Sequence, residues 1–92
     1  MNLQNIEFDK NSTYFEHNLD TSGIPTVFIH GVGLDHTMWL PQKKYFHDKN
    51  VIFYDLLNHG RSKKCYKELK FNNFTEQLIQ LVNFLEIKKF NL

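Results

Sequence analysis

The chain of 92 residues has very little of several features that usually narrow a function. Its single cysteine, Cys65, excludes an intrachain disulfide and any metal site built from several cysteines. No apolar run approaches the ~20 residues that span a membrane, and the first residues lack the basic and apolar regions of a signal peptide. The formal net charge is +1, and the lysine pairs at 43–44, 63–64 and 88–89 are isolated. We therefore expect a cytoplasmic protein that binds neither nucleic acid nor membrane.

The composition is that of a packed globular chain. Hydrophobic residues make up 41% of it and aromatic residues 15%, which is enough for a core. The length allows one domain at most, or part of one.

One stretch, residues 25–35, organises the expected fold. Thr26 to Ile29 form a short, continuously apolar run after Pro25, which predicts a strand buried on both faces, as in a parallel sheet. Gly31 and Gly33 follow at once. A strand that ends in such a loop directs backbone N–H groups at one spot, which suits an anion or a developing oxyanion.

Further strands and a short helix are expected around this stretch. Segments 3–8 and 13–18 predict an antiparallel hairpin, and 51–54 predicts a second buried strand. Asp35 is expected to cap a helical segment that begins at His36 and that Pro41 breaks or restarts. The two buried strands and this segment form a βαβ unit with parallel strands. The residues expected to face inward from the helical segment are Met38, Trp39, Tyr45 and Phe46.

The clearest predicted helix covers 74–85. Its apolar residues recur at helical spacing and form one stripe. Asn73 is expected to cap the helix, with Glu76 completing a capping box. Residues 90–92 resemble the beginning of another strand. The stripe consists of Phe74, Leu78, Leu81, Val82 and Leu85.

Two motifs, each at the end of a predicted buried strand, resemble those of one family. His30-Gly31-Val32-Gly33, followed by residues 35–39, resembles the oxyanion loop after the third strand of the α/β-hydrolase fold. Residues 55–62, Asp-Leu-Leu-Asn-His-Gly-Arg-Ser, resemble the Asp-x-x-Gly-His-Gly-x-Ser loop after its fourth strand. The resemblance covers about residues 13–92. It implies an α/β fold in which residues 1–92 are the N-terminal, incomplete part of a single α/β-hydrolase domain.

The resemblance also implies site residues and a reaction class. The backbone N–H of Val32, or else that of Gly33, would be the oxyanion donor of this loop, while His30, Gly31, Leu34 and Trp39 would lie against the substrate. The full-length parent would hydrolyse an ester, thioester, amide or related bond of a small molecule, without a cofactor or metal.

The residues of a catalytic triad are not expected in this chain. The G-x-S-x-G nucleophile elbow is absent from the sequence, and in the family the acid and the histidine come later still. Ser62 is interpreted as a turn residue and Cys65 as an inert thiol. His30 and His59 are expected to stiffen their loops by hydrogen bonding, and the five histidines show no metal-ligand spacing. We therefore expect the isolated chain to be inactive.

Two departures from the family pattern concern the backbone. Asn58 and Glu86 stand where the family often has glycine, and Asn tolerates a left-handed conformation better than Glu does.

An alternative function also follows from the sequence. The chain is then a non-catalytic interaction module, or one half of a split enzyme, that pairs through the exposed edge of strand 27–29 with itself or with a C-terminal partner polypeptide. We expect the isolated chain to be marginally stable or to self-associate.

Overall fold

A four-stranded mixed sheet forms the centre of the molecule. The computed structural model describes residues 5–19, 23–45, 50–64 and 68–92. The strand order is β1-β2-β4-β3, in which β1 pairs with β2 and β2 with β4 antiparallel, while β3 and β4 are parallel. This confirms the predicted hairpin and the parallel βαβ strands. The strands are β1 Asn5–Phe8, β2 Tyr14–Asn18, β3 Thr26–Ile29 and β4 Val51–Tyr54.

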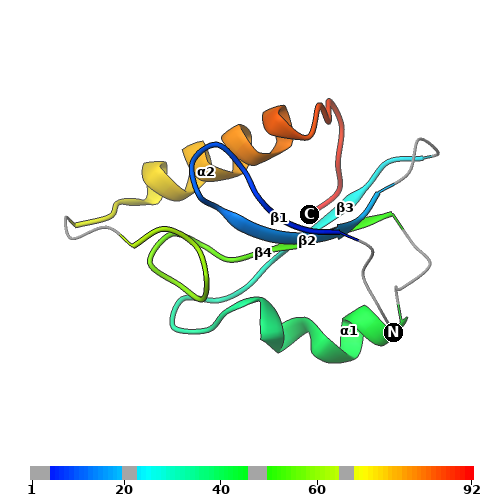
Figure 1. Ribbon diagram of the computed structural model, residues 1–92, viewed down its shortest axis with the longest axis horizontal. Coiled ribbons are helices and arrows are strands. Elements are labelled where there is room, and N and C mark those ends of the chain that lie inside the picture. Colours follow the sequence, from blue (N-terminus) through cyan, green and yellow to red (C-terminus); the bar gives the residue numbers. More distant parts are fainter. Residues whose placement is uncertain (1–4, 20–22, 46–49, 65–67) are drawn as a thin grey trace.

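Helices cover both faces of this sheet (Figure 1). The 3₁₀ helix η1, His36–Trp39, and α1, Leu40–Tyr45, lie on one face, and α2, Phe71–Phe84, lies on the other. All four residues of β4 are buried, because β4 lies between two strands and is covered by helices on both faces of the sheet. The described residues contain no helix that is long and apolar enough to span a membrane.

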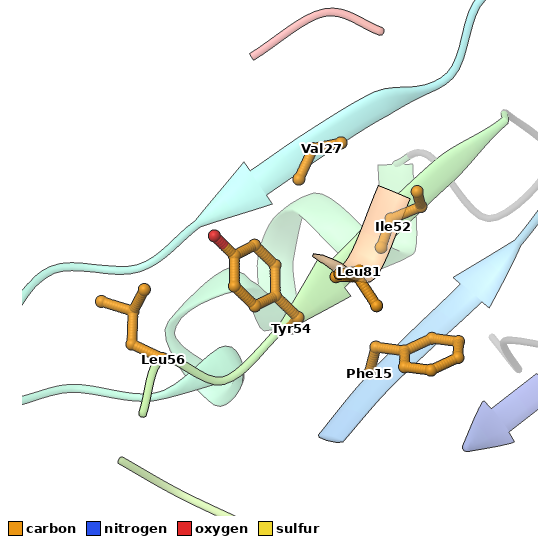
Figure 2. Packing of buried hydrophobic residues seen from close by; sticks show 6 residues of the cluster. All are labelled: Phe15, Val27, Ile52, Tyr54, Leu56 and Leu81. Carbon is orange, nitrogen blue, oxygen red and sulfur yellow. The ribbon is translucent and has the colours of Figure 1, made fainter. Parts of the chain in front are cut away.

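The core lies between the sheet and α2 (Figure 2). Side chains from β2, β3 and β4 meet Leu81 of α2 there, and partly buried residues of the predicted stripe pack around them. The buried cluster consists of Phe15, Val27, Ile52, Tyr54, Leu56 and Leu81.

The predicted start of α2 is wrong by three residues. The helix begins at Phe71, its N-cap is Lys70, and Asn73 lies in the first turn. The Asn73 side chain accepts a hydrogen bond from the Lys70 backbone N–H at 2.8 Å, so it has the role of the third helical residue in a capping box. A lysine side chain cannot accept the cap hydrogen bond, so only the half of the box that Asn73 provides is formed.

The other end of α2 contains a strained residue. Glu86 has φ +58, the left-handed conformation that the family pattern suggested for this position. The N–H of Ile87 reaches the carbonyl of Val82 at 2.8 Å, and that of Glu86 reaches Asn83 at 3.0 Å. These two bonds form a Schellman motif with glutamate at the position that favours glycine.

The segment after β3 follows the prediction at its start and departs from it later. Asp35 caps η1 by accepting a hydrogen bond from the Thr37 N–H at 2.8 Å. Met38 is 39% exposed and Tyr45 74% exposed, so their predicted inward orientation is wrong. Lys43 is buried instead, because its ammonium pairs with Glu16 and lies over the Phe53 ring. Phe46 lies outside the described residues.

Residues near the C-terminus extend the sheet beyond β3. Asn91 forms a parallel bridge with Thr26 and accepts the Val27 N–H at 2.7 Å. Its own N–H donates to Pro25 at 2.8 Å. The predicted strand opening at 90–92 therefore lies beside β3 in the parallel orientation.

Candidate active-site loops

Two loops meet at the carboxyl ends of β3 and β4. The first, residues 30–34, contains the predicted oxyanion loop (residues 31–34), and the second, residues 55–62, is called the β4 loop. Because β3 and β4 are neighbouring parallel strands, both loops leave the sheet at the same edge. The resemblance in sequence thus corresponds to a contact in space.

His30 joins the first loop to the second. Its Nε2 accepts the Leu56 N–H at 2.9 Å, and its Nδ1 lies 2.8 Å from the carbonyl oxygen of Gly31. A carbonyl cannot donate, so Nδ1 carries the proton and Nε2 is the acceptor. The ring is 3% exposed and both nitrogens are engaged, which fits the loop-stiffening role better than contact with a substrate.

His59 joins the β4 loop to the first loop in the same way. Its Nε2 accepts the Gly33 N–H at 3.0 Å, and its Nδ1 lies 2.8 Å from the Leu57 carbonyl oxygen. Asn58 has φ +65, as its position in the turn predicted.

The backbone N–H groups of the predicted oxyanion loop differ in what they already bind. The Gly33 N–H donates to His59, and the Leu34 N–H donates to the Gly31 carbonyl at 3.0 Å. Within the part of the chain that the structure describes, the Val32 N–H has no hydrogen-bond partner. Val32 is 81% exposed, and Gly33 has φ +89, a conformation that favours glycine. Val32 is therefore the more available of the two predicted donors.

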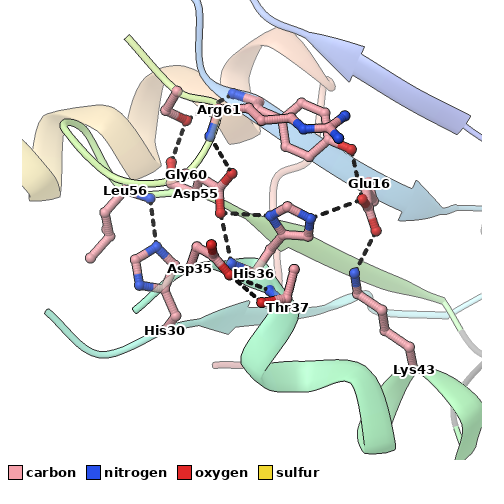
Figure 3. A network of polar contacts seen from close by, with 12 residues as sticks. Glu16, His30, Asp35, His36, Thr37, Lys43, Asp55, Leu56, Gly60 and Arg61 are labelled. Atoms are coloured by element: carbon pink, nitrogen blue, oxygen red, sulfur yellow. Dashed lines mark hydrogen bonds and ion pairs between the residues drawn. The ribbon is translucent and has the colours of Figure 1, made fainter. Parts of the chain in front are cut away.

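Asp55, directly after β4, is the hub of a buried network (Figure 3). Its Oδ1 accepts the His36 N–H at 2.7 Å and lies 2.8 Å from His36 Nδ1, while its Oδ2 accepts the Arg61 N–H at 2.9 Å. A Cβ on Gly60 would overlap this carboxylate, so the glycine allows the loop to close on Asp55. Burial opposes ionisation, but the hydrogen bonds from His36 and Arg61 outweigh it and lower the pKa of Asp55.

The network continues from His36 to β2 and α1. His36 Nε2 lies 3.2 Å from Glu16 Oε2, and Lys43 Nζ lies 2.6 Å from Glu16 Oε1. The hydrogen bonds with Asp55, then with Glu16, raise the pKa of His36 to about 9, so the ring is an imidazolium at neutral pH. Burial alone would raise the pKa of Glu16, but hydrogen bonds from His36, Lys43 and Tyr14 lower it to about 2.

This network is the feature that the sequence analysis missed. Glu16 lies two residues after the buried Tyr14 in β2, so both side chains point to the same face of the sheet. A charged side chain on a buried face indicates that a partner for its charge lies nearby. The Tyr14 hydroxyl donates to Glu16 at 2.7 Å, and burial followed by this bond raises the pKa of Tyr14 to about 12.

Ser62 lies inside the β4 loop and has a structural role. Its Oγ accepts the Tyr14 N–H at 2.9 Å and donates to the Asp55 carbonyl at 2.6 Å, and the residue is 3% exposed. This agrees with its interpretation as a turn residue. Cys65 lies outside the described residues.

A cluster of Asp35, His36 and Asp55 brings together three groups that could ligate a metal ion. Each is already engaged: Asp35 caps η1, and Asp55 and His36 bind one another. The cluster is thus accounted for by contacts within the protein.

The remaining predicted site residues lie apart from one another. Leu34 lines a shallow hollow between the two loops, together with Met38 and His59. Trp39 stacks edge-on against Phe28, with ring centroids 5.1 Å apart, beside the outer edge of β3. Val32 borders a separate, apolar hollow on the α2 side of the sheet. Leu34 and Val32 therefore lie in the first loop but border different hollows, and Trp39 packs against Phe28 of β3.

Comparison with known proteins finds hydrolases. No family model matches the chain. A hydrolase from Acinetobacter baylyi, named (E)-2-((N-methylformamido)methylene)succinate hydrolase, is 32% identical over 90 residues, which are 95% of this chain and 33% of that protein. A thermophilic esterase from Thermogutta terrifontis superposes with a TM-score of 0.72 at 31% identity, over 80% of this chain and 27% of the esterase. The chain has an α/β-hydrolase fold.

Two further similarities complete the comparison. Epoxide hydrolases of the α/β-hydrolase superfamily, from hot-environment metagenomes, superpose with a TM-score of 0.77 at 20% identity, over 98% of this chain and 32% of that chain. An acetoin-cleaving-system component from Pseudomonas putida, a dihydrolipoyllysine-residue acetyltransferase, is 32% identical over 71 residues, 76% of this chain and 19% of that protein. The chain thus spans about a third or less of the length of the relatives it matches.

Proposed function

We propose that residues 31–34 supply the backbone half of an oxyanion hole, with the Val32 N–H as the donor. The observation that carries this proposal is the state of the amides of Val32, Gly33 and Leu34: those of Gly33 and Leu34 bind within the protein, while that of Val32 has no partner among the described residues. An N–H held in this way stabilises charge that develops on a substrate oxygen without reorganising at the moment of reaction.

The reaction proposed is hydrolysis of an ester, thioester, amide or related bond of a small molecule by a longer, cytoplasmic α/β hydrolase. The Acinetobacter relative is named as a hydrolase of an N-methylformamido compound, and the Thermogutta relative is an esterase. We propose that the 92 residues alone are inactive, because Ser62 is buried in a turn and the nucleophile elbow is absent from the sequence.

A chimeric enzyme tests the role of Val32. Residues 1–92 replace the matching segment of the Acinetobacter hydrolase, and Val32→Pro then removes the N–H while Val32→Ala keeps it. We expect Val32→Pro to lower kcat by about 10²–10³ with little change in KM, and Val32→Ala to leave kcat within about twofold.

Equal kcat values in the two folded variants would contradict the role of Val32. If the chimera does not fold, the same pair of variants is compared with the 92-residue chain and the rest of the Acinetobacter hydrolase as two polypeptides.

A second candidate function is an interaction module that pairs through the outer edge of β3. The observation in its favour is the apolar hollow on the α2 side of this edge. The exposed apolar residues that border it are Ile29 (37% exposed), Val32 (81%), Phe71 (83%) and Leu92 (74%). The mass of the polypeptide isolated from its source separates the two functions: a mass near 11.1 kDa favours the module, and a much larger mass favours the hydrolase.

A further inference from the structure

The two loops are joined by a reciprocal pair of contacts in which each contributes a histidine. His30 of the first loop accepts a backbone N–H from the second, and His59 of the second accepts a backbone N–H from the first. The ring centroids lie 5.1 Å apart. Both bonds use Nε2 as the acceptor.

We propose that His30 and His59 are positioning residues that form a clamp: they hold the oxyanion loop against the β4 loop and leave the Val32 N–H as the donor that the loop presents. The clamp itself stands on the contacts, and only the role of the Val32 N–H rests on the proposed function.

The local carbonyls select the tautomer that the clamp requires. Each Nδ1 faces a carbonyl oxygen of its own loop at 2.8 Å, Gly31 for His30 and Leu57 for His59. This contact places the proton on Nδ1 and leaves a lone pair on Nε2 toward the opposite loop. A ring protonated at both nitrogens would turn Nε2 from an acceptor into a donor facing another N–H. The clamp therefore needs both imidazoles neutral.

The clamp also decides which amide is presented. His59 binds the Gly33 N–H at 3.0 Å and so removes the second predicted donor, while the 31–34 turn uses the Leu34 N–H. Gly33 reaches His59 with φ +89, which a residue with a side chain rarely adopts. The neighbouring Val32 amide is left without a partner among the described residues, and the residue is 81% exposed.

The N–N scalar coupling across each hydrogen bond, measured by NMR on the ¹⁵N-labelled 92-residue chain, tests the clamp directly. We expect a coupling between the Gly33 amide nitrogen and His59 Nε2, and another between the Leu56 amide nitrogen and His30 Nε2. Resolved amides without these couplings would overturn the clamp, as would amides of Gly33 and Leu56 that exchange as fast as those of an unstructured peptide.

Variants of His59 then separate positioning from general stability. In Gln the side-chain oxygen reaches roughly the place of Nε2, so His59→Gln keeps the acceptor and His59→Ala removes it. We expect His59→Ala to accelerate Gly33 amide exchange about tenfold or more relative to exchange in β4, and His59→Gln to restore most of the protection. Lys63→Ala, an exposed change in the neighbouring turn, is the control and leaves the ratio unchanged.

His30→Gln keeps an acceptor for the buried Leu56 N–H and provides the second arm if His59→Ala does not fold. It should retain Leu56 protection. Equal Gly33 exchange in His59→Ala, His59→Gln and the unmodified chain would overturn the proposal. A Val32→Pro result that contradicts the oxyanion role would leave these couplings in place, so the two proposals fail separately.

Discussion

At the scale of single residues, Gly60 illustrates a requirement set by a neighbour. Its φ is +50, and an added Cβ would overlap the Asp55 carboxylate, which cannot retreat because it is buried and triply hydrogen-bonded. We expect Gly60→Ala to lower the free energy of unfolding by about 2–4 kcal/mol, measured by urea denaturation. Gly23→Ala is the control: φ is +79 but the space is open, so only backbone strain of about 1 kcal/mol applies. Equal losses of unfolding free energy in the two variants would mean that the Asp55 side chain moves to make room for the added Cβ.

Glu86 is the opposite case, a residue whose replacement by glycine relieves strain. It is exposed and has φ +58 at the end of α2. We expect Glu86→Gly to raise the free energy of unfolding by about 0.5–1 kcal/mol, because glycine adopts this conformation without a Cβ clash. Glu86→Ala removes the same carboxylate but keeps the strain, so a gain in Glu86→Ala of the same size would show that charge is the cause.

At the scale of elements, one polar side chain attaches α2 to the sheet. Gln77 is 1% exposed; its Nε2 donates to Thr13 Oγ1 at 3.0 Å and to the Asp55 carbonyl at 2.9 Å, and its Oε1 accepts the Leu57 N–H at 3.0 Å. We expect Gln77→Leu to cost about 2–3 kcal/mol of unfolding free energy, because the partly buried Leu57 N–H loses its acceptor and the buried Thr13 hydroxyl loses a donor. Gln80→Leu, on the exposed side of the same helix, is the control for helix propensity and should change stability by less than about 0.5 kcal/mol.

The elements themselves show which information the sequence contains. The buried strands were predictable because they are short, continuously apolar runs, and α2 because its apolar residues recur at helical spacing. The two loops were predictable because their glycines and polar residues follow the order of a family motif. The Asp55–His36–Glu16 network was not predictable, since it joins residues from β2, η1 and the end of β4 that are distant in the chain. The burial of Lys43 depends on its contact with Glu16 of the same network. The apolar residues of the segment therefore did not indicate which face of α1 is buried.

At the scale of the whole molecule, this network makes stability depend on pH. The pKa of His36 is raised from 6.5 to about 9, so its contribution is complete below about pH 6.5 and is lost as the pH rises through 9. The pKa of Glu16 is lowered from 4.5 to about 2, so its contribution is present above pH 4.5 and is lost as the pH falls through 2. The network therefore stabilises most between about pH 4.5 and 6.5.

Urea denaturation at several pH values measures this dependence. From about pH 6 to about pH 9.5 we expect a loss of about 1–3 kcal/mol, and His36→Gln should remove most of this slope. Ile79→Ala, an exposed change on α2, should retain it. An unchanged alkaline slope in His36→Gln would assign the loss to other groups.

We expect the outer edge of β3 to determine how the isolated chain behaves in solution. Asn91 pairs with this strand at Thr26 and Val27, and beyond that point Ile29 and Val32 border an apolar hollow together with Phe71. An apolar strand edge without charge is a template for association, because a second chain can add both backbone hydrogen bonds and buried surface there. We therefore expect the sedimentation coefficient of the 92-residue chain to rise with concentration.

A charge on this edge should prevent the association. Ile29→Lys places an ammonium at the end of β3, where the residue is 37% exposed, and should restore a monomer. Ile79→Lys adds the same charge to an exposed position on α2, 51% exposed, and so controls for net charge. A monomer at all concentrations with a sharp cooperative melt would contradict the prediction, and association that both variants abolish would point to charge rather than to the β3 edge.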